Sequence, residues 1–130
     1  MNAEQELFHA YREWRRLALA EGQAIEMRDW TLLADCQTAI EDFQKLVGAL
    51  NLAARQEWEL TGQACDQKEA VLRVYRHELV EITRRNQRLL QAAQATAQTK
   101  LSELSEAGRN LKLLQRSYAF GSDTAWSFVS

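Results

Sequence analysis

Residues 72–118 read LRVYRHELVEITRRNQRLLQAAQATAQTKLSELSEAGRNLKLLQRSY, and this stretch decides the fold. Its apolar and small residues recur every three or four positions, which is the period of one face of an α-helix. The stripe runs through Leu72, Tyr75, Leu79, Ile82, Asn86, Leu89, Ala93 and Thr96, and after a one-residue shift through Ala97, Leu101, Leu104, Gly108, Leu111, Leu114 and Tyr118. The pattern predicts one very long helix, with Gly108 as its candidate break.

Two more helical stripes precede this stretch. The first predicts a helix over about residues 3–27, and the second predicts a helix over about residues 30–60. The first stripe is Leu7, Tyr11, Trp14, Ala18, Glu21 and Ile25. The second is Leu33, Cys36, Ile40, Phe43, Val47, Leu50 and Ala54, widened by Leu32, Ala39, Leu46 and Ala53.

The corners between the helices carry their own signals. The carboxylate of Asp29 is suited to cap the second helix, and Gly62 is suited to a left-handed helix end. Asp66 and Glu69 predict a capping box that begins the third helix. Within the first helix, Gly22 costs about 1 kcal/mol relative to alanine and predicts a weak point.

The composition supports an all-helical fold. The chain has 130 residues, no proline and only five glycines, so the turn residues that usually separate strands are scarce. We predict an all-α antiparallel bundle of three long helices, the third being the longest. The expected helical bundle domain covers residues 1–118, and a flexible C-terminal tail with Trp126 and Phe128 covers residues 119–130.

The predicted helices differ greatly in length. At 1.5 Å per residue they would be about 37, 46 and 80 Å long. The third helix should therefore extend beyond the other two by about 20 residues. Three arrangements could then cover its leucine stripe. The chain could fold back at Gly108 as a short fourth helix, the stripe could pair with a second copy of the chain, or it could bind a segment of another protein.

Two polar residues occupy positions on the apolar stripes. Glu21 and Asn86 each need a hydrogen-bond partner, since a buried unpaired polar group costs roughly 1–3 kcal/mol. One interpretation is that both fix the register of the helices, as polar residues do in coiled coils. The other is that Asn86 contacts a partner together with its neighbours Arg84, Arg85 and Arg88.

The charge is nearly balanced, with 16 basic and 18 acidic residues and a net charge of −2. This balance argues against a nucleic-acid partner. Residues 1–60 carry eleven acids and six bases, whereas residues 61–130 carry seven acids and ten bases, so we expect ion pairs between helices. The N-terminus resembles no secretory signal, no apolar run would span a membrane, and the two cysteines suit a reducing cytoplasm.

No recognisable catalytic constellation is present, so we expect no enzyme, no catalytic residue, no cofactor and no metal. Glu6 and His9 form an E-x-x-H string of the kind that di-iron bundles use, but such bundles need a second copy. His77 begins half of a zinc-protease motif, in which Glu81 stands where the second histidine belongs. A metal-bundle enzyme is therefore the least favoured alternative, and metal content in the purified protein would test it.

Several short strings resemble the FlgN-type flagellar export chaperones in their order along the chain. A glutamate precedes an alanine near the end of the first helix, and an acidic residue starts the second. An asparagine–leucine patch follows, and a terminal tyrosine precedes a glycine. The strings are Glu21–Ile25, Arg28–Leu33, Arg85–Leu90, Leu101–Leu104 and Ser117–Gly121.

The resemblance implies a cytoplasmic chaperone of the type III flagellar secretion system. Such chaperones bind the C-terminal helical segments of hook–filament junction proteins and deliver them to an export-gate membrane protein. By position, the partner-binding residues would be Leu101, Leu104, Leu111, Leu114 and Asn86. Tyr118 would dock on the cytoplasmic domain of the export gate. The alternative function is a structural coiled-coil or adaptor protein that forms a homodimer through the same leucine stripe.

Overall fold

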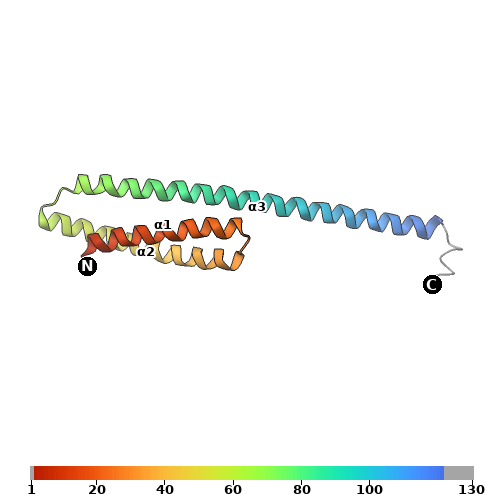
Figure 1. Cartoon of the computed structure of the whole chain (residues 1–130), viewed down its shortest axis with the longest axis horizontal. Helices are drawn as coiled ribbons and strands as arrows, with labels where there is room; N and C mark the ends of the chain where they lie inside the picture. Colours follow the sequence, from red (N-terminus) through yellow and green to blue (C-terminus); the bar gives the residue numbers. More distant parts are fainter. Residues whose placement is uncertain (1, 122–130) are drawn as a thin grey trace. The chain divides into compact units, whose positions relative to one another are not determined.

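Three helices make up the described part of the chain. In this computed structural model the backbone is described for residues 2–121 and the side chains for residues 2–117. The helices are α1 (Ala3–Glu26), α2 (Trp30–Thr61) and α3 (Cys65–Gly121), and residues 2–121 contain no strand. Figure 1 shows α1, α2 and the first part of α3 running side by side in alternating directions. The predicted all-α antiparallel bundle of three helices is confirmed.

The chain divides into two compact units. The first ends at Gln91 and the second begins at Ala92. The first unit contains α1, α2 and the first part of α3, and it holds most of the buried residues. The second unit contains the remainder of α3, which stays helical through residues 119–121. The predicted boundary at residue 118 differs from this division, and residues 122–130, with Trp126 and Phe128, lie outside the described residues.

The helix ends follow the predicted capping chemistry with one exception. Asp29 caps α2, where its carboxylate accepts a hydrogen bond from the Leu32 amide at 3.1 Å. Gly62 ends α2 with a φ of 69°, the left-handed conformation that glycine adopts without strain. The third helix begins at Cys65, so Asp66 lies inside the first turn and does not cap it. There its charge complements the positive end of the helix dipole.

The core of the first unit contains most of the predicted stripe residues and one large residue beyond them, whereas Leu32 and Leu46, which were expected to widen the second stripe, are exposed. The buried stripe residues include Leu7, Tyr11, Ile25, Leu33, Cys36, Val47, Ala54, Leu72 and Leu79. Phe43 and Leu50 are half-buried and pack against this core. Trp58, four residues beyond the end of the predicted α2 stripe, is completely buried. The core therefore extends to the end of α2 that faces the α2–α3 corner.

Gly108 does not interrupt α3. The helix continues through this position, and a Cβ atom built on Gly108 would meet no atom within 4 Å. The fold-back at Gly108, one of the three alternatives for the leucine stripe, is therefore wrong. An exposed helix-interior glycine costs about 0.5–1 kcal/mol relative to alanine. In this helix the cost is too small to end thirty residues of otherwise favourable helical sequence.

Glu21 and Asn86 are partners of each other. The Asn86 side-chain amide donates to the Glu21 carboxylate at 2.9 Å and to the Ala18 carbonyl oxygen at 2.7 Å. Asn86 is only 3% exposed, so these two bonds supply the partners that its burial requires. They tie α3 to α1 at one register, as the first interpretation of the polar stripe residues predicted.

Gly22 makes room for the contact between Asn86 and α1. A Cβ atom on Gly22 would lie 2.5 Å from the Asn86 Oδ1 atom, well inside van der Waals distance. The glycine is buried, and its missing side chain makes room for the asparagine. Gly22 lies inside an unbroken α1, and its missing side chain allows Asn86 of α3 to approach α1 closely at this point.

Candidate partner-binding surfaces

The first candidate surface is the leucine row, defined as Leu101, Leu104, Leu111 and Leu114 of the second unit. These four side chains are between 56% and 69% exposed. Their spacing of three, seven and three residues places them on one face of α3, within about 140° of arc. Contiguous exposed apolar side chains of this size are typical of interaction sites.

The other two predicted site positions are placed differently. Asn86 belongs to the first unit, where its amide is bonded to α1, and the leucine row belongs to the second. The two hydrogen bonds of the Asn86 side chain are made within the first unit. Tyr118 lies within α3, but its side chain lies outside the described residues.

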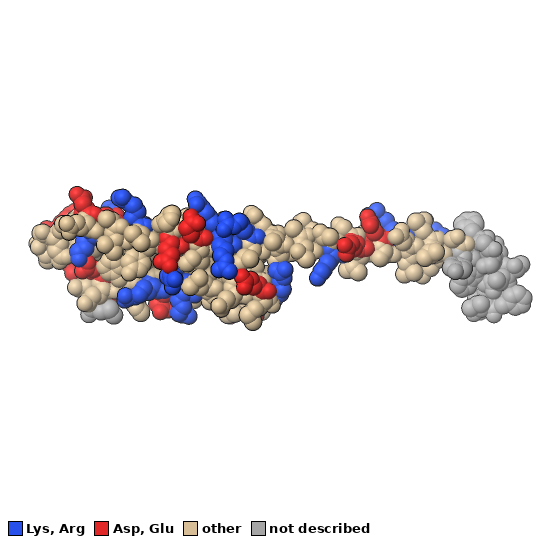
Figure 2. Space-filling view, turned by 45° about the horizontal axis from the view of Figure 1, so that its top comes forward, with Lys and Arg blue, Asp and Glu red and all other residues tan. Residues whose placement is uncertain are grey.

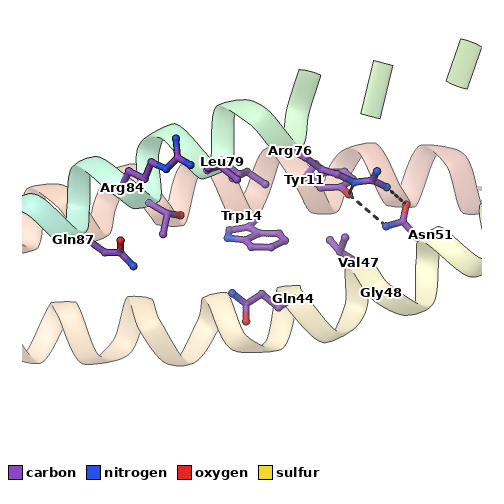
Figure 3. Close-up of a pocket in the computed structure, with 12 residues that line it drawn as sticks. Tyr11, Trp14, Gln44, Val47, Gly48, Asn51, Arg76, Leu79, Arg84 and Gln87 are labelled. Carbon is purple, nitrogen blue, oxygen red and sulfur yellow. Dashed lines mark hydrogen bonds between the residues drawn. The ribbon is translucent and has the colours of Figure 1, made fainter. Parts of the chain in front are cut away.

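A second candidate surface is a groove between α2 and α3 of the first unit, which the sequence reading missed. We call it the α2–α3 groove, and its volume is about 670 Å³. The residues that line it are Tyr11, Trp14, Gln44, Val47, Gly48, Asn51, Arg76, Leu79, Val80, Thr83, Arg84 and Gln87. Figure 3 shows the Trp14 indole between the two helices, above Gln44.

Aromatic rings from α1 form the floor of the α2–α3 groove. The rings of Tyr11 and Trp14 are nearly parallel, with an angle of 3° between their planes and 6.3 Å between their centroids. Tyr75 of α3 stacks with Tyr11 at a centroid distance of 5.9 Å, and it packs against the core cluster that contains Tyr11. Tyr11 is buried, so the half-buried Trp14 ring is the part of this floor that gives a partner a rigid apolar contact.

A hydrogen-bonded network closes one end of the groove. The Arg76 guanidinium donates to the Tyr11 hydroxyl at 3.0 Å, to the Asn51 side-chain oxygen at 3.3 Å and to Glu69 at 3.2 Å. Arg55 also donates to Glu69, at 2.7 and 3.0 Å. Figure 3 shows Arg76, Tyr11 and Asn51 converging from three helices. The network therefore fixes the positions of all three helices at this end.

These contacts shift two pKa values. The hydrogen bond from Arg55, assisted by that from Arg76, lowers the pKa of Glu69 below its usual 4.5. The hydrogen bond to Tyr11, assisted by Glu69, raises the pKa of Arg76. Glu69 is therefore ionised, and Arg76 charged, over the whole physiological range. Elsewhere, burial raises the pKa of the Cys36 thiol, which keeps that thiol in its unreactive protonated form.

The lowered pKa of Glu69 predicts a pH dependence of folding. A carboxylate whose pKa is lower in the folded state stabilises the fold fully above its unfolded pKa, and this stability is lost as the pH falls. We expect the denaturation midpoint to decrease below about pH 4.5, and Glu69→Gln to flatten this decrease. Urea titrations at several pH values would measure it. Glu59→Gln, an exposed acid of α2, is the control, and an unchanged pH profile in Glu69→Gln would contradict the assignment.

Part of the unequal charge of the two halves of the sequence forms ion pairs between helices, as expected. Lys68 pairs with Glu4 and Arg85 pairs with Glu26, both joining a base of α3 to an acid of α1. Arg15 pairs with Glu78 in the opposite sense. Figure 2 shows basic and acidic side chains interspersed over the visible face of the first unit. The Arg85–Glu26 and Arg15–Glu78 pairs are exposed and each worth little, whereas the Lys68–Glu4 pair is partly buried, and together the three favour this arrangement of helices.

The described residues contain no group of three or more histidine, cysteine, aspartate or glutamate side chains placed to hold a metal ion. Glu6, His9 and His77 are all exposed, and both cysteines are free thiols. Within residues 2–121, no helix combines the length and the apolar character needed to cross a membrane. The two surfaces described above are thus the strongest candidates for function in the described part of the chain.

The support for both candidate surfaces comes from the sequence and structure of this chain. Comparison with protein-family models, with curated proteins and with solved structures finds no match to this chain.

Proposed function

We propose that this protein is a cytoplasmic chaperone of the type III flagellar export system, similar to the FlgN type. The leucine row binds the C-terminal helical segment of a hook–filament junction protein and keeps it from assembling early. Tyr118 then docks the loaded chaperone on the cytoplasmic domain of an export-gate membrane protein. The protein performs no chemical reaction in this role, because its task is to cover an apolar segment and release it.

The observation that carries the proposal is the exposure of the leucine row. Burying a leucine side chain stabilises a complex by roughly 1.5–3 kcal/mol before the entropic costs of binding are subtracted. An amphipathic helix laid along such a face is a recurrent mode of recognition. The row spans residues 101–114, about 20 Å of helix, which matches about four turns of a partner helix.

A second candidate function is homo-oligomerisation, and the symmetry of the leucine row favours it. Leu101 and Leu104 repeat the three-residue step of Leu111 and Leu114, and the small pair Ala107–Gly108 lies midway. An antiparallel second copy would therefore meet leucines with leucines and cross at the small residues. In this case the protein would be a structural or adaptor subunit.

Calorimetric titration distinguishes the two functions. We expect saturable binding of a C-terminal peptide from a junction protein, and none of an unrelated amphipathic helix. Leu104→Ala with Leu111→Ala should weaken this binding at least tenfold and leave the thermal midpoint unchanged, since both side chains are exposed. The control is Leu52→Ala with Leu60→Ala, which removes two exposed leucines of α2 in the first unit.

Other outcomes would contradict the chaperone. If no flagellar segment binds and sedimentation shows a concentration-dependent dimer that the double leucine variant abolishes, the protein is the structural subunit. If the double variant lowers the thermal midpoint by many degrees, the leucine row is covered within the chain and serves stability.

A further inference from the structure

The α2–α3 groove has no role in the function proposed above, and its lining residues include basic but no acidic side chains. Two of its lining residues are the cations Arg76 and Arg84, and none is an acid. Arg76 is engaged by Tyr11, Asn51 and Glu69. Arg84 makes one ion pair, with Glu81 at 3.3 Å, between two side chains that are more than half exposed. Such a pair contributes little, so the Arg84 charge is available to an incoming carboxylate.

The shape of the groove fits a helix. Its lining runs along α3 from Arg76 to Gln87, which is about 16 Å or three helical turns. The floor comes from α1 through Tyr11 and Trp14, so a further helix would lie opposite α1 (Figure 3). That is the position of the fourth member of a four-helix bundle.

Gly48 provides an independent reason to expect a close neighbour. It lies in the interior of α2 and lines the groove, and a Cβ atom built on it would meet no atom within 4 Å. The glycine therefore costs about 0.5–1 kcal/mol of stability relative to alanine, and no contact within the chain requires it. A glycine on a groove wall allows the backbone of a partner to approach α2 closely.

The charges select among the helices that could occupy the groove. The segment that carries the leucine row has Lys100, Arg109, Lys112 and Arg116 against Glu103 and Glu106, a net charge of +2. A second copy of that segment would bring more positive charge to Arg84. The favoured occupant is therefore a helix from a different protein, with apolar side chains on one face and carboxylates beside them.

We propose that the α2–α3 groove is a second docking site, which binds an acidic amphipathic helix of a partner protein and completes a four-helix bundle. The apolar face of that helix covers Trp14 and Val80, which line the groove and are not buried, and its carboxylates pair with Arg84. The site is separate from the leucine row, so this proposal stands whether or not the chain is an export chaperone.

Two synthetic helical peptides of about 16 residues, long enough to cover the groove, test this proposal on the full chain. Both carry the same leucine face, flanked by glutamate in one peptide and by lysine in the other. We expect calorimetry to show saturable binding of the glutamate peptide, at least tenfold tighter than the lysine peptide and weakened by added salt. Equal affinities, or no saturable binding of the glutamate peptide, would overturn the proposal.

Variants locate the site. Gly48→Leu should weaken the binding of the glutamate peptide at least tenfold, because the new side chain occupies the groove. The thermal midpoint of this variant should stay equal or rise, because leucine favours helix and a Cβ atom at this position meets no other atom. Arg84→Glu changes an exposed side chain and should shift the binding preference toward the lysine peptide. This variant tests the proposal even if Gly48→Leu does not fold. Leu104→Ala with Leu111→Ala should not change the affinity. Loss of binding in this last variant, or wild-type binding in Arg84→Glu and Gly48→Leu, would place the peptide elsewhere.

Discussion

Trp58→Ala is expected to lower the free energy of unfolding by about 3–5 kcal/mol, the range found for tryptophan truncation in well-packed cores. Among the side chains of residues 2–117, Trp58 is the largest that is completely buried, and it belongs to the core cluster with Leu7, Ala54 and Leu72. Because this cluster draws its side chains from all three helices, we expect the removal of Trp58 to leave a cavity that no single helix can fill by moving. A loss of this size is a large part of the 5–15 kcal/mol typical of a domain.

Urea denaturation followed by circular dichroism measures this effect. Leu60→Ala is the matched control, since Leu60 lies two residues further along α2 and is 88% exposed. We expect its midpoint to stay within experimental error of the unmodified protein. Equal midpoints for Trp58→Ala and Leu60→Ala would show that the end of α2 does not belong to the cooperative core.

Trp58 also shows why part of the core was not predicted. The α2 stripe alternates steps of three and four as far as Ala54, and the next position of that series is Glu57. Burial instead continues at Trp58, through a second step of four. A straight helix drifts by about 20° per heptad relative to a 3.5-residue repeat, and this drift brings Trp58 to the core face. The Leu50, Ala54, Trp58 series was the available signal.

The helices themselves follow from periodicity, because apolar spacing and capping residues are local. Asp29 and Gly62 were identified in advance as helix ends for this reason. The leucine row was also predicted, because it needs only the length difference between helices. Its function depends on a partner that the sequence does not contain.

The α2–α3 groove could not be predicted in the same way. Its floor and closed end depend on contacts between residues far apart in the chain, such as Tyr11 with Arg76 and with Asn51. Whether two helices touch or leave a groove depends on the volumes of side chains from a third, here Tyr11 and Trp14. A one-dimensional pattern gives the face of a helix but not the distance to its neighbour.

Gly22→Ala is expected to destabilise the protein by about 1–3 kcal/mol, the cost of breaking a buried polar contact, although alanine is the better helix former. The new Cβ atom would lie 2.5 Å from Asn86 Oδ1, so the asparagine must move. It is a short side chain held by the Ala18 carbonyl and the Glu21 carboxylate, and any movement that relieves the overlap strains both bonds.

The sign of this effect should reverse when Asn86 is removed. In an Asn86→Ala background the overlap is gone, and Gly22→Ala should stabilise the protein by about 0.5–1 kcal/mol through helix propensity alone. A double-mutant cycle from four urea denaturation curves measures the coupling. Gly48→Ala, at an exposed helix position with open space, is the control and should stabilise equally in both backgrounds. If Gly22→Ala changes the free energy of unfolding in the same direction with and without Asn86, the glycine is not needed for the asparagine contact. The register of α1 and α3 is then set by apolar packing alone.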